Sequence, residues 1–96
     1  MQCKLTAPEL RERKATVIAR LKKEIKNKEE MANGFAYQFD GSDAMMDEII
    51  SFVKVERTCC DFLDFNLSIR GDGSEARLEI TGPEGTKDFI QTELEL

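Results

Sequence analysis

The stretch FLDFNLSIRGDGSEARLEI, residues 62–80, decides the fold of this chain. Apolar and polar side chains alternate over residues 63–70, and the alternation returns over residues 75–81 after the glycine-rich segment 71–74. A period of two is typical of a strand with one buried face, and a short connection containing glycine indicates a hairpin. The sequence therefore predicts two antiparallel strands joined by residues 71–74.

The segment before this hairpin has helical spacing. Its apolar residues recur three and four positions apart, which is typical of an amphipathic helix: Met46, Ile49, Ile50 and Val53. Ser42 or Asp43 is suited to the N-cap position. The pattern predicts a helix that runs from there to about Thr58.

An aromatic strand is predicted earlier in the chain. Asn33-Gly34 is a turn signal, and Phe35, Tyr37 and Phe39 alternate with smaller or polar residues after it. We expect Tyr37 to be a sheet residue with its hydroxyl at the surface, because tyrosine presents an apolar body and a polar tip.

The two ends of the chain are predicted to be helical. At the N-terminal end, Thr6 and Glu9 have the spacing of a capping box, and the apolar stripe that follows continues to Ile25. Lys14 interrupts this stripe, and its aliphatic stem is expected to cover the gap. The helix should end near Asn27, in the charged run 26–30. At the other end, Gly82-Pro83-Glu84 indicates the start of a last helix with Phe89, Ile90 and Leu94 on its apolar side.

The order of elements defines the expected fold class. Helix, strand, helix, strand, strand and helix follow one another over residues 1–96, with no repeat or linker between them. Strands with one polar side suit an antiparallel sheet that is covered on one face. We therefore expect a single α+β domain, with a three-stranded antiparallel sheet and helices mainly on one face.

Composition limits the classes of function. The 96 residues are 41% hydrophobic, enough for one core without disulfide or metal staples. No apolar run is long enough to cross a bilayer, and the N-terminus lacks an apolar signal core, so we expect a cytoplasmic protein. The net charge is −5, although residues 1–30 carry nine Lys/Arg against five Asp/Glu. This basic first helix could attract a protein partner or a second copy, whereas general nucleic-acid binding requires a more basic domain.

Cysteine is the candidate for chemistry. Cys59 and Cys60 are adjacent at the predicted junction of helix and strand, Cys3 lies near the start, and the chain has no histidine. A Cys–His hydrolase is therefore excluded. The C-terminal end of a helix and the carboxylates of Glu56 and Asp61 all raise the pKa of a thiol, so the pair is not expected to be a strongly activated nucleophile.

Three interpretations of the cysteines remain open. Thiolates favour soft ions of the zinc, copper(I), arsenic(III) or mercury(II) class, and Cys3, Cys59 and Cys60 would make a three-sulfur site with Glu56 or Asp61 as a fourth ligand. A bond between neighbouring cysteines would be strained and easily reduced, which suits a redox sensor. Free cysteines are also often buried as small hydrophobic residues, and then have only a packing role.

Two segments resemble a family of small, largely uncharacterised prokaryotic proteins. ERTCCDFLDF at residues 56–65 and ITGPEGTKDF at residues 80–89 match a pattern E-R-x-C-C-x-F-x-x-F followed by T-G-P-x-G-x-x-x-F. Cys3-Lys4-Leu5-Thr6 matches a C-x-L-T segment near the start of many members. Asp61 stands where the family commonly has proline. The resemblance supports the fold and singles out Cys3, Cys59 and Cys60 together.

The sequence thus predicts a binding protein more readily than an enzyme, because no acid–base constellation is present. The first hypothesis is a cytoplasmic protein that holds a soft metal or metalloid ion, or senses thiol oxidants, through Cys59 and Cys60 with Cys3 and Glu56. The alternative is a non-catalytic interaction module with packed cysteines. Its basic first helix or an exposed sheet face would recruit an unidentified protein or form a homodimer. Neither hypothesis involves nucleic acid or a membrane.

Overall fold

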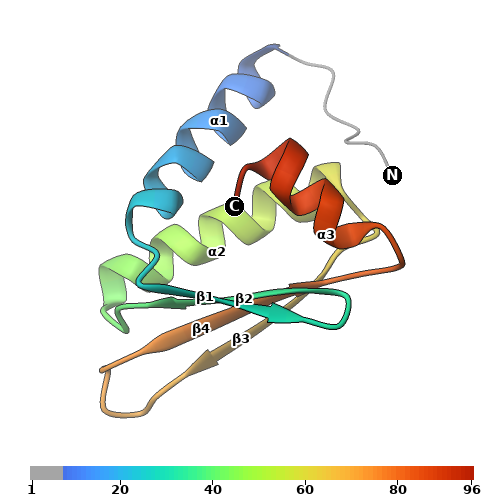
Figure 1. Cartoon of the computed structure of the whole chain (residues 1–96). Helices are drawn as coiled ribbons and strands as arrows, with labels where there is room; N and C mark the ends of the chain where they lie inside the picture. The colour runs from blue at the N-terminus through green and yellow to red at the C-terminus, as the bar shows by residue number, and fades with distance from the viewer. Residues whose placement is uncertain (1–7) are drawn as a thin grey trace.

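Three helices lie on one side of a four-stranded antiparallel sheet, and the first helix packs against the second and rises away from the sheet (Figure 1). The computed structural model describes residues 8–96. The elements follow in the order α1 (Pro8–Lys23), β1 (Asn27–Met31), β2 (Gly34–Phe39), α2 (Asp43–Cys59), β3 (Asp64–Ile69), β4 (Ala76–Thr81) and α3 (Thr86–Phe89), which continues into a π-helical turn (Ile90–Leu94). No helix in the described part of the chain combines the length and apolar character that a membrane span requires.

The α+β class is confirmed, but the expectation of three strands is wrong. The sheet has the order β1-β2-β4-β3, and its fourth strand, β1, occupies the charged run in which α1 was expected to fade. β1 pairs with β2 from Asn27 opposite Gln38 to Met31 opposite Gly34. Its sequence NKEEM has no alternation of apolar residues because the strand is almost entirely exposed at the sheet edge. Pairing with β2 therefore determines its conformation, and local sequence pattern does not.

The predicted hairpin of β3 and β4 is confirmed. Asp64 lies opposite Thr81 and Ile69 opposite Ala76, so the apolar residues of both strands share the face beneath the helices. In β4 these residues, Ala76, Leu78 and Ile80, are completely buried. β4 also pairs with β2, and a Cβ at Gly34 would collide with the carbonyl of Ile80, so this close approach requires glycine.

α2 begins as predicted at the Ser42 cap, whose hydroxyl oxygen accepts a hydrogen bond of 3.2 Å from the Met45 amide. One stripe of the helix is buried: Met45, Ile49, Phe52, Glu56 and Cys59. The stripe is apolar except for Glu56 near the C-terminal end. The helix therefore delivers a carboxylate and a cysteine into the core at the point where the chain turns toward β3.

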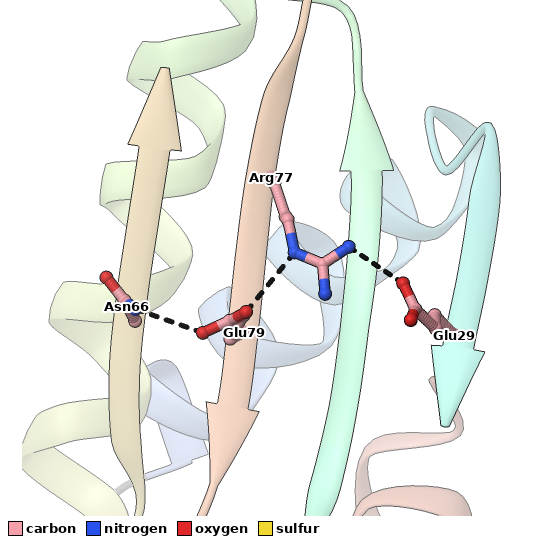
Figure 2. Close-up of polar contacts among 4 residues, drawn as sticks. All are labelled: Glu29, Asn66, Arg77 and Glu79. Atoms are coloured by element: carbon pink, nitrogen blue, oxygen red, sulfur yellow. Dashed lines mark hydrogen bonds and ion pairs between the residues drawn. The ribbon is translucent and has the colours of Figure 1, made fainter. Parts of the chain in front are cut away.

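The opposite face of the sheet is polar. Figure 2 shows a chain of contacts across it: Asn66 of β3 donates to Glu79, and Arg77 bonds both Glu79 and Glu29 of β1. The ion pairs have N–O distances of 3.2 and 2.8 Å. Because these charges already have partners within the sheet, this face is not an open apolar surface for another protein.

Tyr37 departs from expectation. Only 1% of the residue is exposed, and its hydroxyl has no hydrogen-bond partner among the described residues. Burial raises the pKa of this phenol well above its ordinary value. The prediction of a surface hydroxyl is wrong because Tyr37 lies opposite Leu78 in the register, on the face covered by helices.

We therefore expect Tyr37→Phe to raise the free energy of unfolding by about 1 kcal/mol, since a buried hydroxyl without a partner is a cost that phenylalanine removes. Denaturant unfolding checks this value. A loss of stability on the same scale would show that the hydroxyl makes a hydrogen bond in solution.

Candidate thiol and metal site

The last turn of α2 gathers the candidate ligands. Glu56 and Cys59 are three residues apart and share the buried stripe of the helix. Cys60 is the C-cap residue, and its amide donates to the Glu56 carbonyl at 2.6 Å. The chain then turns, with the Leu63 amide donating to the Cys60 carbonyl at 3.2 Å. The predicted junction of helix and strand is therefore confirmed, and it fixes all three side chains at one end of the core.

These side chains form a compact and fully buried group. The sulfur atoms of Cys59 and Cys60 are 3.2 Å apart. One carboxylate oxygen of Glu56 and the two sulfurs all lie within 4.8 Å of one another. Each of the three residues has an exposed fraction of 0%. It is the only group of three potential metal-ligating side chains of this kind within residues 8–96.

Lys14 brings a positive charge to the group from α1. Its Nζ lies 3.2 Å from the sulfur of Cys59 and 3.4 Å from Oε2 of Glu56, and 14% of its side chain is exposed. The aliphatic stem was expected to cover a gap in the apolar stripe, and the structure shows that the ammonium group also contacts the site. The sequence does contain a sign of this contact. One helix has a lysine in its apolar stripe and another helix has a glutamate in its own, and two such opposite charges can pair in the core.

The Glu56 carboxylate is in an unfavourable environment for a charge. Neither oxygen makes a hydrogen bond among the described residues, although Lys14 is at ion-pair distance. Burial raises the pKa of Glu56, and the Lys14 ammonium opposes that rise. A buried carboxylate normally requires hydrogen bonds in addition to one cation, so this group has unused capacity to bind a ligand.

Cys60 is a neutral thiol at neutral pH. Burial, followed by the nearby Glu56 charge, raises its pKa to about 11, while Lys14 opposes the rise. This agrees with the expectation that the pair is not activated for nucleophilic attack. At neutral pH this thiol would become a thiolate only if a ligand such as a soft metal ion displaced the proton from its sulfur and bound there.

The two cysteines differ in oxidation state. Cys59 is disulfide-bonded, whereas Cys60 is free and buried, so the bond between neighbouring cysteines that a redox sensor was expected to use is not formed. Coordination of one ion by both sulfurs therefore requires the reduced form of Cys59, because a disulfide sulfur carries no thiolate charge. In the structure as it stands, only the Cys60 sulfur of the pair is a thiol.

The predicted ligands meet only in part. The structure brings together Glu56, Cys59 and Cys60, whereas the exposed Asp61 is not part of the group. Cys3 lies outside the described residues, so its predicted place in a three-sulfur site stays a prediction. Lys14 is the residue that sequence reasoning did not assign to the site.

A groove lies on the solvent side of Lys14. It has a volume of about 540 Å³ between α1 and the C-terminal turn, and Lys14, Ile18 and Leu94 are among the residues that line it. Lys14 contacts the sulfur site and also lines this groove.

Comparison with known proteins gives no further identification: no family model, curated protein or solved structure matches the chain. The function must therefore be argued from the group of Glu56, Cys59, Cys60 and Lys14 itself.

Proposed function

We propose that the protein binds one soft metal or metalloid ion through the thiolates of Cys59 and Cys60, with the Glu56 carboxylate as a third ligand. The observation that carries this proposal is the buried carboxylate without hydrogen bonds beside two buried sulfurs. A packing role explains two buried cysteines, and the buried glutamate beside them has one counter-charge, Lys14, but no hydrogen bond among the described residues. A bound ion would give the carboxylate and both sulfurs a favourable partner.

Charge balance supports a cationic ligand. Two thiolates and a carboxylate carry three negative charges, and burying them together is unfavourable without compensation. Lys14 supplies one positive charge at 3.4 Å from Glu56, and a metal ion would supply the remainder. Sulfur ligands favour copper(I) and zinc, and the arsenic(III) and mercury(II) class has the same preference for thiolates. Hard cations such as magnesium, which prefer an all-oxygen site, are the poorer fit.

Thiol redox sensing is the second candidate, and a separate observation favours it. Cys59 is disulfide-bonded and its sulfur lies 3.2 Å from the free Cys60 sulfur. Formation of a disulfide from two thiols gives two electrons and two protons to an oxidant, for which a peroxide is the relevant chemical class. Oxidation would remove the thiolate ligands, so the two functions would exclude each other at this site.

The interaction module with packed cysteines is the remaining alternative. Complete burial of both sulfurs fits it, since buried cysteines are often inert. It predicts that ions of the soft class leave the stability of the reduced protein unchanged.

The test is a titration of the fully reduced protein with Zn(II), Cd(II) or As(III), followed by thermal unfolding and by pH. The proposal predicts a saturable increase in melting temperature. Because Cys60 has a pKa of about 11 and must lose its proton to bind, apparent affinity should rise with pH. The expected rise is about tenfold per pH unit for each proton released below that pKa. Affinity independent of pH would contradict thiolate ligation, and no thermal shift with any of these ions would favour the packed alternative.

A further inference from the structure

The two edges of the sheet differ in how they are protected. β1 carries three consecutive charges, Lys28, Glu29 and Glu30, and each has a partner elsewhere in the fold. Charged side chains are a common means of preventing an edge strand from pairing with another chain. β3, the other edge strand, has no charged residue between Phe65 and Ile69.

The free edge of β3 exposes backbone groups that are ready to pair. The Arg70 amide donates to the Glu75 carbonyl at 3.0 Å, and the register continues with Ser68 opposite Arg77. Because hydrogen-bonded pairs alternate along an antiparallel ladder, the backbone groups of Phe65, Leu67 and Ile69 point away from β4. No strand pairs with them within residues 8–96.

The side chains of the same residues are only partly covered. Phe65 and Leu67 are half-buried beneath the helices, and Ile69 is 43% exposed. Phe65 contacts Phe52 of α2 with perpendicular rings, which fixes its position at this margin of the core. A strand added beside β3 would cover these side chains as well as their backbone groups.

We infer that two copies of the chain pair antiparallel through β3 about a two-fold axis at Leu67. In this register Leu67 lies opposite the second copy's Leu67, and Phe65 opposite the second copy's Ile69. The outward-pointing backbone groups then face one another, as an antiparallel ladder requires. The result is a continuous eight-stranded sheet with both β1 strands at its ends.

The charges of β3 favour a second copy as the occupant. On the polar face of the sheet the same register places Asp64 opposite the second copy's Arg70, and the symmetry repeats this pair at the other end of the junction. Register can change only in steps of two residues, because a one-residue step reverses the faces. One such step places Asp64 opposite Ser68, and the step in the other direction places it opposite Asp72. Only the register centred on Leu67 pairs opposite charges at both ends.

The experiment is sedimentation equilibrium of the full chain over a concentration series, with reductant present to exclude intermolecular disulfides. Asp64→Arg and Arg70→Asp should each raise the dimer dissociation constant about tenfold, because each places like charges opposite one another twice. The double variant Asp64→Arg/Arg70→Asp restores opposite charges and should return the constant to the wild-type value. Glu12→Arg, which makes the same charge change on the exposed surface of α1, is the matched control and should have no effect.

Amide hydrogen exchange gives a second readout on the wild type. The amides of Phe65, Leu67 and Ile69 should exchange more slowly as the concentration rises, while those of Lys28 and Glu30, which point outward at the β1 edge, should not change. A wild-type protein that is monomeric at all concentrations would overturn the inference. A double variant Asp64→Arg/Arg70→Asp that fails to recover the wild-type dissociation constant would also overturn it. So would amide exchange that slows in β1 and not in β3.

Discussion

Replacing both Cys59 and Cys60 with serine is expected to abolish stabilisation by soft metal ions. Wild-type protein at an ion concentration of a hundred times the dissociation constant should gain about 2.7 kcal/mol. For a domain of this size that corresponds to a rise in melting temperature of about 10–20 °C. The double variant should show none of this rise, because a serine hydroxyl is not a thiolate ligand.

The comparison must be made for each variant with and without the ion. Both cysteines are completely buried, so each serine hydroxyl without a partner should itself lower stability by about 1–3 kcal/mol. Glu56→Gln, which keeps the size of the side chain, is the milder variant and should weaken binding about tenfold or more. Asp47→Asn, which removes an exposed carboxylate of the same helix outside the ligand group, is the matched control and should leave the shift intact. An undiminished shift in the double serine variant would contradict thiolate binding.

Lys14→Met is expected to lower the free energy of unfolding of the reduced, ion-free protein by about 3 kcal/mol. The substitution removes the ammonium group 3.4 Å from Glu56 and leaves a fully buried carboxylate without a counter-charge. Breaking a buried ion pair by removing one partner has this magnitude, because the remaining charge is not solvated. Lys22→Met, at an exposed position of the same helix, is the control and should change stability by less than about 0.5 kcal/mol.

The double variant Lys14→Met/Glu56→Met distinguishes this cause from lost packing. It replaces the pair with two flexible apolar side chains and should recover to within about 1 kcal/mol of wild type. The pH dependence has a defined sign. Burial raises the folded-state pKa of Glu56, so the neutral acid is favoured at low pH and stability from this group is lost as pH rises through that pKa. The deficit of Lys14→Met should therefore shrink on acidification. A deficit that is constant with pH, or additive in the double variant, would show that the charge of Glu56 is not its cause.

Local patterns in the sequence were sufficient for most of the fold. The alternation in residues 63–70 and 75–81 predicts the β3–β4 hairpin because burial on one face of a strand imposes a period of two. Ser42 predicts the start of α2 because its hydroxyl binds a free amide of the first turn. β1 could not be predicted in this way, since its strand conformation comes from pairing with β2 and its side chains do not enter the core.

The candidate site, too, could be predicted from the sequence only in part. Glu56, Cys59 and Cys60 are near one another in sequence, so helical spacing alone places them together. The contact with Lys14 joins residues 45 positions apart and depends on how α1 packs against α2. The burial of Tyr37 likewise depends on which face of the sheet the helices cover, and a single strand does not specify that.

Native mass spectrometry of the reduced chain with zinc, cadmium or arsenic(III), beside the Cys59→Ser/Cys60→Ser variant under the same conditions, tests directly whether the two thiolates bind an ion. We expect one bound ion per wild-type chain and none in the variant. A wild-type chain that takes up no ion of this class, or a variant that takes up the same number, would contradict this expectation.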